Sequence, residues 1–213
     1  VLTDIEAVPE ALLAARKAYV ARRLEEVAVR SSARAEDGED YSNAGQYASV
    51  LNVRGCEAVE AAVEKCLASL QGERARKYAD TFLCGQYTTM TVVVQRQIDA
   101  VLAGVCFTAD PTGDPGNVLI EVVEGAGEAL VSGEKSAQAT RIPVDSIDLA
   151  YIRDTVAPQG LLNAQGLYAI ARDAVAAKAA LGKELDTEWA IDAEGVLHWL
   201  QARPITVADG VTL

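Results

Sequence analysis

Two short segments near the end of the chain constrain its fold most strongly, because both alternate polar and apolar side chains. Their sequences are Asp186-Thr-Glu-Trp-Ala-Ile-Asp and Leu200-Gln-Ala-Arg-Pro-Ile-Thr206, with Ala193-Glu194-Gly195 between them. Successive side chains of a strand point to opposite faces, so this pattern predicts two β-strands joined by a tight turn. One face of the first strand would then be acidic and the other apolar.

A turn at Glu194-Gly195 sets the register of this predicted hairpin. Two of the resulting cross-strand pairs lie on the polar face and two on the apolar face: Glu188–Gln201 and Asp186–Arg203, and Trp189–Leu200 and His198–Ile191. On this register His198 is expected to be a packed strand residue. The polar pairs bring a carboxylate, an amide and a guanidinium together.

These three groups are the components of a site for a metal-bound phosphate. Carboxylate and amide oxygens are hard ligands that suit Mg²⁺, and an arginine fork beside them suits a phosphate group. An ordinary amphipathic hairpin with a solvated polar face explains the same pattern, and the hairpin taken alone favours that explanation. Other segments of the chain decide between the two.

Six segments, taken together, resemble the nucleotide-binding domain of phosphoenolpyruvate synthases and pyruvate phosphate dikinases, and they occur in the order found in that family. They begin with Val27-Ala-Val-Arg-Ser-Ser-Ala33, Ala44-Gly-Gln-Tyr-Ala-Ser-Val-Leu-Asn-Val53 and Val92-Val-Val-Gln95, and continue with Gly104-Val-Cys-Phe-Thr108, Gly125-Ala-Gly-Glu-Ala-Leu-Val-Ser-Gly133 and Leu200-Gln-Ala-Arg-Pro-Ile-Thr206. A co-linear set that runs from Val27 to Thr206 is far more specific than a single glycine motif.

Composition agrees with this resemblance and excludes other classes of partner. The chain has 213 residues, half of them hydrophobic, which is enough for one domain of two lobes. A net charge of −12 argues against nucleic acid as a partner. The four cysteines have no Cys-x-x-Cys spacing and fit reduced thiols, and no apolar run approaches the roughly 20 residues of a membrane span. We therefore expect a cytoplasmic protein without a membrane partner.

Hydrophobic periodicity predicts a mixture of helices and strands. Helical spacing extends over Pro9–Glu26, Glu57–Leu83 and Leu161–Leu181, and β-rich runs cover Glu26–Arg30, Met90–Gln97, Val101–Thr108 and Asn117–Glu124. Because these elements do not alternate regularly, they indicate an α+β domain.

The resemblance implies an ATP-grasp fold, whose two lobes close on a nucleotide. Residues 1–95 would be the remainder of the first lobe, with a phosphate flap. Residues 96–213 would be the second lobe, with the metal and phosphate hairpin. The glycine-rich segment that opens the family's domain, and its phosphate-binding lysine, has no counterpart before Asp4. The first lobe is therefore expected to be incomplete.

Arg30 is the first candidate phosphate ligand outside the hairpin. It ends a strand of three apolar residues and precedes two serines, so its guanidinium emerges at the edge of an element. The resemblance implies that it contacts the transferred phosphates. A surface ion pair with Glu36 or Asp37 is the alternative.

Further nucleotide contacts are also implied by the resemblance. Gly45 permits close approach of the backbone to a ligand, and Gln46 to Ser49 would close over the phosphates as a flap. Gln95 and Gln97 would contact the adenine edge, although both also fit exposed strand residues. Glu128 would assist the metal or the ribose.

The resemblance implies a mechanism as well. ATP binds between the lobes, and Glu188 and Gln201 hold Mg²⁺. Asp186 supports these two residues without binding the metal directly. Arg203 and Arg30 stabilise charge on the phosphoryl group during transfer. The β-phosphate passes to a histidine on a separate swivelling domain, AMP and phosphate are released, and the phosphohistidine moves to an acceptor-substrate domain. The chain by itself is then expected to turn over poorly or not at all.

Three alternatives remain open at this point. The domain could belong to a rifampin phosphotransferase, a relative that shares several of the same segments. It could be a catalytically inactive nucleotide-binding module, or an ATP-grasp ligase that forms ADP. Release of AMP rather than ADP would distinguish the dikinase type from the ligase.

Overall fold

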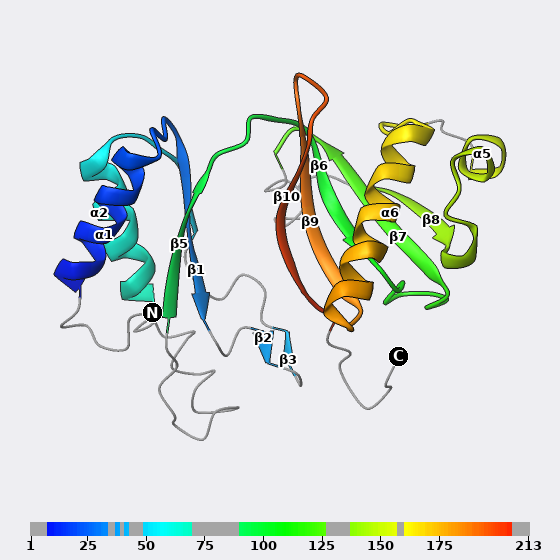
Figure 1. Cartoon of the computed structure of the whole chain (residues 1–213), viewed down its shortest axis with the longest axis horizontal. Coiled ribbons are helices and arrows are strands. Elements are labelled where there is room, and N and C mark those ends of the chain that lie inside the picture. The colour runs from blue at the N-terminus through cyan, green and yellow to red at the C-terminus, as the bar shows by residue number, and fades with distance from the viewer. Residues whose placement is uncertain are drawn as a thin grey trace. The chain divides into compact units, whose positions relative to one another are not determined.

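The computed structural model describes residues 8–33, 37–38, 41–42, 49–69, 90–126, 137–156 and 160–205 (Figure 1). The chain divides into two compact units, Val1–Gln97 and Ile98–Leu213. Each unit contains a β-sheet and helices, which confirms the predicted mixture of helix and sheet.

The first unit is a three-stranded antiparallel sheet with two helices. Its strand order is β4-β1-β5, and a separate two-stranded ribbon is formed by β2 and β3. The elements are α1 (Val8–Ala21), β1 (Val27–Ala33), β2 (Asp37–Gly38), β3 (Tyr41–Ser42), β4 (Ser49–Val53), α2 (Cys56–Ala68) and β5 (Met90–Arg96).

The core of this unit lies between the two helices and one face of the sheet. Val27 and Val29 of β1 are fully buried there against Val59 and Val63 of α2. Because side chains alternate along β1, Ala28 and Arg30 face away from the helices. Arg30 therefore lies on the opposite face of the sheet.

The second unit is a five-stranded antiparallel sheet in the order β10-β9-β6-β7-β8. Its strands are β6 (Ala100–Phe107), β7 (Asn117–Glu124), β8 (Gln138–Pro143), β9 (Leu185–Asp192) and β10 (Leu197–Pro204). Its helical elements are η3 (Val144–Ser146), α5 (Leu149–Tyr151), the π-helix η4 (Ile152–Val156) and α6 (Ala164–Leu181).

Helix α6 confirms the helix predicted for this region, and both of its ends follow from the sequence. The side chain of Asn163 accepts a hydrogen bond from the backbone N–H of Gly166, which caps the first turn. Gly182 ends the helix in the left-handed conformation, with φ of 69°. The helix therefore begins after the cap rather than at Leu161.

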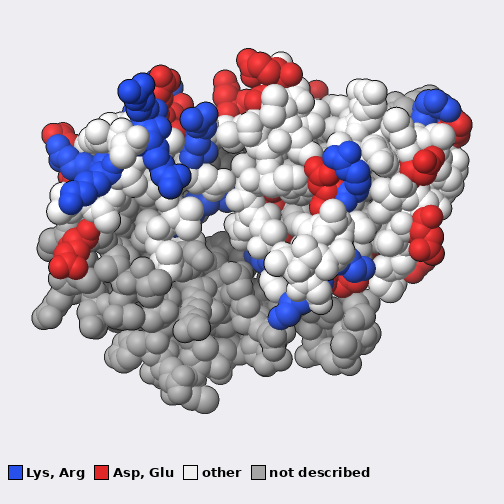
Figure 2. Space-filling view, in the orientation of Figure 1, with Lys and Arg blue, Asp and Glu red and all other residues white. Residues whose placement is uncertain are grey.

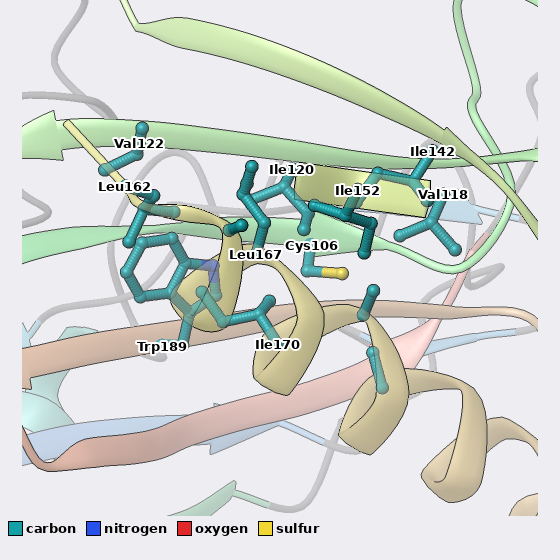
Figure 3. Close-up of a cluster of buried hydrophobic side chains, with 13 residues drawn as sticks. Cys106, Val118, Ile120, Val122, Ile142, Ile152, Leu162, Leu167, Ile170 and Trp189 are labelled. Carbon is teal, nitrogen blue, oxygen red and sulfur yellow. The ribbon is translucent and has the colours of Figure 1, made fainter. Parts of the chain in front are cut away.

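One face of the five-stranded sheet packs against α6 and forms the main core of the unit (Figure 3). Trp189 of β9, Ile120 of β7 and Ile170 of α6 are all fully buried in it. Burial of each such large side chain contributes roughly 1.5–3 kcal/mol. Burial also raises the pKa of Cys106 to about 12, so this thiol stays protonated in the core.

The register of the β9–β10 hairpin differs in part from the predicted one. Asp186 lies opposite Arg203 and Glu188 opposite Gln201, as predicted. Trp189, however, lies opposite Trp199, so the predicted pairing with Leu200 is wrong.

The length of the turn explains this difference. Asp192 and Val196 close a three-residue loop, in which the N–H of Asp192 donates to the carbonyl of Val196 over 3.2 Å. A three-residue loop shifts the pairing by one residue relative to a two-residue turn. A bulge between Trp199 and Gln201 then restores the predicted pairs farther from the turn.

The same shift moves His198. It lies opposite Ala190 rather than Ile191, and its Nε2 is 2.7 Å from Oδ2 of Asp192. His198 is therefore half-buried and bound to a carboxylate. Its expected role as an apolar-face packing residue is wrong.

Gly104 of β6 is a position where a side chain has no room. A Cβ atom there would meet the backbone carbonyl oxygen of Glu121 and lie 2.6 Å from Cζ2 of Trp189. We expect Gly104→Ala to lower the free energy of unfolding of the second unit by about 2–3 kcal/mol, because a packed core cannot absorb the added methyl group. The chain's two tryptophans, Trp189 and Trp199, both lie in this unit, so fluorescence during urea denaturation measures it directly.

Gly166→Ala is the matched control in the same unit. Its nearest contact would be Cδ2 of Leu162, a movable side-chain end, at 3.1 Å. Since alanine favours a helix over glycine by up to about 1 kcal/mol, this variant should be as stable as the wild type or more stable. Equal stability of both variants would contradict the packing account of Gly104.

Candidate functional site

The ion pair between Asp186 and Arg203 is the best-defined part of the candidate site. Nε and Nη2 of Arg203 both donate to Oδ2 of Asp186, over 2.8 and 2.7 Å. The side chains are 19% and 11% exposed for Arg203 and Asp186, respectively, so the pair is mostly shielded from water. Burial raises the pKa of Asp186, and the adjacent guanidinium opposes that rise.

The other carboxylate oxygen of Asp186, Oδ1, does not take part in the ion pair with Arg203. Oδ1 is buried and accepts no hydrogen bond from the described part of the chain. A buried carboxylate oxygen without a donor is costly, and a cation or a donor from a ligand would relieve that cost. This atom lies on the same face of β9 as Glu188.

Glu188 and Gln201 form the second cross-strand pair on this face. Both are half-buried, and they lie directly opposite each other. Directly opposed side chains have Cβ atoms about 4.5–5.5 Å apart, so their oxygens can approach one ion. Together with Oδ1 of Asp186 they form a set of hard oxygen donors, which fits Mg²⁺.

This donor set does not enclose a metal by itself. Among the described residues, no group of three or more His, Cys, Asp or Glu side chains is placed to hold a metal ion. A metal bound by Glu188 and Gln201 must therefore complete its coordination with other oxygens. Water and phosphate groups are the oxygen ligands that Mg²⁺ commonly keeps.

Two charged residues that the sequence did not single out also lie on this face of the sheet. Glu188 is opposite Val105, which is opposite Glu121 of β7. Asp186 is linked in the same way through Phe107 and Leu119 to Arg141 of β8. A single acid inside the apolar run Val118–Val123 was a usable signal for Glu121. Arg141 had no comparable signal.

Arg141 stabilises the loop between β6 and β7. Its Nε donates to Oδ2 of Asp110 over 2.6 Å, and the N–H and hydroxyl of Thr112 both donate to Oδ1 of Asp110 over 2.8 Å. Burial raises the pKa of Asp110, but these bonds outweigh it and hold that pKa below its ordinary value. The loop that leaves the site-bearing strand β6 is thus fixed at its base.

In the first unit, three of the predicted residues lie on one face of the sheet. Arg30 is opposite Ser49 of β4 and Val93 of β5, and Ala28 is opposite Gln95. Since Val27 and Val29 face the helices, Arg30, Ser49 and Gln95 share the other face. Whether they contact a ligand remains a prediction.

Gln97 follows β5 at the end of the first unit. Its backbone N–H donates to the carbonyl of Glu26 over 2.9 Å, which anchors the segment to the start of β1. Its side-chain oxygen Oε1 is buried and accepts no hydrogen bond from the described residues. An acceptor of this kind suits a ligand N–H group, such as the one expected from adenine.

Several predicted residues lie outside the described part of the chain. They are Gly45, Gln46 and Glu128. The alternative partners considered for Arg30 are not tested either, because Glu36 and the side chain of Asp37 are also outside it.

Several exposed arginines of the described residues form ion pairs with neighbouring acids. Figure 2 shows basic and acidic groups intermixed on the visible face, and Arg54, for example, is 2.9 Å from Glu26. None of the helices in the described ranges is long and apolar enough to cross a membrane.

Comparisons with known proteins confirm the predicted resemblance. The family described as "Pyruvate phosphate dikinase, AMP/ATP-binding domain" matches residues 4–161. The chain is 37% identical to a prodigiosin synthesizing transferase, PigC, from Serratia marcescens, over 84% of this chain and 22% of that protein.

Two further relatives carry other names. A probable phosphoenolpyruvate synthase from Methanothermobacter thermautotrophicus is 34% identical, over 87% of this chain and 30% of that protein. A rifampicin phosphotransferase from Streptomyces sp is 34% identical, over 93% of this chain and 26% of that protein. The chain thus spans less than a third of the length of these relatives.

The geometry of the Asp186–Arg203 pair makes a prediction about stability. Arg203→Met leaves the Asp186 charge buried without its partner, so we expect a loss of about 3 kcal/mol in the free energy of unfolding. Adding Asp186→Asn removes that charge and should recover at least about half of the loss. Urea denaturation followed by tryptophan fluorescence measures both, and a double variant less stable than Arg203→Met would contradict the pairing.

Proposed function

This chain belongs to the AMP/ATP-binding domain family of pyruvate phosphate dikinases, and on that premise we propose that it binds ATP and Mg²⁺ for a dikinase-type phosphotransfer. The β-phosphate of ATP passes to a histidine on a separate domain, and AMP and phosphate are released. That domain and an acceptor-substrate domain are the proposed partners, whether on the same polypeptide or on another chain.

One observation carries the proposal: the register of β9 and β10 places a carboxylate, an amide and a guanidinium on one sheet face. Glu188 and Gln201 are the residues that would hold Mg²⁺, and Oδ1 of Asp186 faces the same surface. Bound Mg²⁺ would neutralise phosphate charge and hold the phosphate oxygens in a fixed orientation.

The protein's own groups then account for the charge that develops during transfer. Arg203 is fixed by Asp186 with its guanidinium plane held by two hydrogen bonds, which limits the reorganisation that transfer requires. Arg30 would supply a second fixed cation to the phosphoryl group. Gly45, Gln46 and Ser49 are proposed as the phosphate flap, and Glu128 as a metal or ribose contact.

We propose further that residues 1–95 and 96–213 are the two lobes of an ATP-grasp domain. The division of the chain between Gln97 and Ile98 supports this, because it falls within two residues of the proposed boundary. Gln95 and Gln97 would contact the adenine edge there. The second assignment is supported by the buried Oε1 of Gln97, which accepts no hydrogen bond from the described residues. The buried thiols of Cys66 and Cys106 fit a protein of a reducing compartment, which we propose is the cytoplasm.

A rifampicin phosphotransferase is the second candidate, because relatives of that name match as much of this chain as the phosphoenolpyruvate synthases do. The two candidates share the nucleotide half of the reaction and differ in the final acceptor. An inactive binding module fits less well, because Glu188, Gln201 and Arg203 are all present. An ADP-forming ligase fits less well, because the co-linear set of motifs is specific to the dikinase type.

Product identity separates the dikinase type from the ligase. Because the proposed acceptor histidine lies on another domain, the chain alone with Mg-ATP should release almost no nucleotide product. With a histidine-bearing domain of a relative supplied, we expect AMP by chromatography of the nucleotides. Steady AMP release by the chain alone, or ADP as the main product, would contradict the proposal.

Glu188→Gln tests the metal assignment. The change removes one anionic ligand, so we expect affinity for Mg-ATP to fall on the order of tenfold, or 1.4 kcal/mol, and affinity for metal-free ATP to change little. Calorimetric titration with and without Mg²⁺ measures both affinities.

Glu194→Gln is the control, because it removes the same charge from the exposed turn of the same hairpin. It should leave both affinities close to those of the wild type. If Glu188→Gln weakened ATP equally in the presence and absence of Mg²⁺, Glu188 would not be a metal ligand.

A further inference from the structure

The start of β9 is held by a buried threonine that the proposed chemistry does not use. Thr108 follows β6 and is fully buried. Its backbone N–H donates to the carbonyl of Leu185 over 2.9 Å. Its hydroxyl donates to Oε2 of Glu184 over 2.6 Å and accepts from the N–H of Leu185 over 2.7 Å. One residue therefore makes three hydrogen bonds to the two residues that precede Asp186.

The same two residues are tied to the other neighbouring elements. Oε1 of Glu184 is 2.6 Å from Nζ of Lys178, in the last turn of α6. The carbonyl of Glu184 accepts from the N–H of Ile205, which follows β10, over 2.9 Å. Glu184 and Leu185 thus join α6, the end of β6 and the end of β10 at one point.

This junction lies at the end of the hairpin where Asp186 meets Arg203. The N–H and the C=O of Leu185 are both held by hydrogen bonds, which leaves the backbone of Asp186 little freedom. The direction of the Asp186 carboxylate is therefore set by these bonds. If the Thr108 hydroxyl is removed, the N–H of Leu185 loses a buried acceptor and Glu184 loses a donor. The residues just before Asp186 then lose their side-chain support from Thr108, while the backbone hydrogen bond from the N–H of Thr108 to Leu185 remains.

We propose that Thr108, acting with Glu184, is a positioning residue that orients the Asp186–Arg203 pair for Mg-ATP. This inference rests on the proposed function, because it names the residue that holds part of that site in place. Thr108 touches neither the phosphates nor the metal in this account. Its effect is transmitted through the first residues of β9.

Thr187 provides a matched control on the same strand. It is also buried, and its hydroxyl donates to the carbonyl of Cys106 over 2.7 Å. Its side chain points to the opposite face from Asp186 and Glu188. Thr108→Val and Thr187→Val therefore both remove one buried hydroxyl, but only the first removes the side-chain hydrogen bonds to Glu184 and Leu185.

The test is calorimetric titration of the chain with Mg²⁺ and a nonhydrolysable ATP analogue. We expect Thr108→Val to weaken binding on the order of tenfold, and Thr187→Val to bind as tightly as the wild type. Thr108→Ser keeps the hydroxyl and should restore binding to within about twofold. Urea denaturation should show comparable stability losses for the two valine variants.

Two results would overturn the inference. One is equal affinity of Thr108→Val and Thr187→Val, and the other is a serine variant as weak as the valine variant. Absence of binding by the wild type would instead contradict the proposed function itself. If Thr108→Val does not fold, Glu184→Ala removes the acceptor of the same hydroxyl at a position that is one-quarter exposed, and wild-type affinity of that variant would overturn the inference.

Discussion

The antiparallel register of β9 between β6 and β10 is the constraint on which the rest of the second unit depends. Trp189 is fully buried against α6, and a strand alternates its side chains, so Asp186 and Glu188 must face the other way. A slip of one residue would move the tryptophan to the polar face and both acids into the core. The free energy of core packing therefore also fixes the position of the charged groups.

Two local irregularities compensate each other within the hairpin. The three-residue loop after Asp192 shifts the pairing by one residue, and the bulge after Trp199 shifts it back. The displaced pairs lie between the loop and the bulge, where His198 binds Asp192. Beyond the bulge, Asp186 meets Arg203 and Glu188 meets Gln201. The end of the hairpin that carries the candidate site thus keeps the predicted register, although the pairs next to the turn do not.

The features that the sequence predicts correctly are those that depend on local patterns. Alternation and helical spacing located most strands and α6, and the charged pairs of the hairpin followed from them. The bulge was missed because turn length is not encoded by alternation. Strand β8, Gln138–Pro143, was missed because it has only six residues and half of them are polar. Arg141 and Thr108 reach the site only through pairings between distant segments, which no local pattern reveals. Glu121 differs from them, because an acid inside an apolar run is a local signal.

The most direct test of the central claim is a calorimetric titration of the wild-type chain with a nonhydrolysable ATP analogue, with and without Mg²⁺. If Glu188 and Gln201 hold a metal ion whose coordination is completed by phosphate oxygens, the analogue should bind clearly more tightly with Mg²⁺ than without it. Mg²⁺ alone should bind weakly. Binding of the analogue that is indifferent to Mg²⁺ would contradict the metal assignment. No binding by a folded chain would contradict the claim that these residues form a nucleotide site.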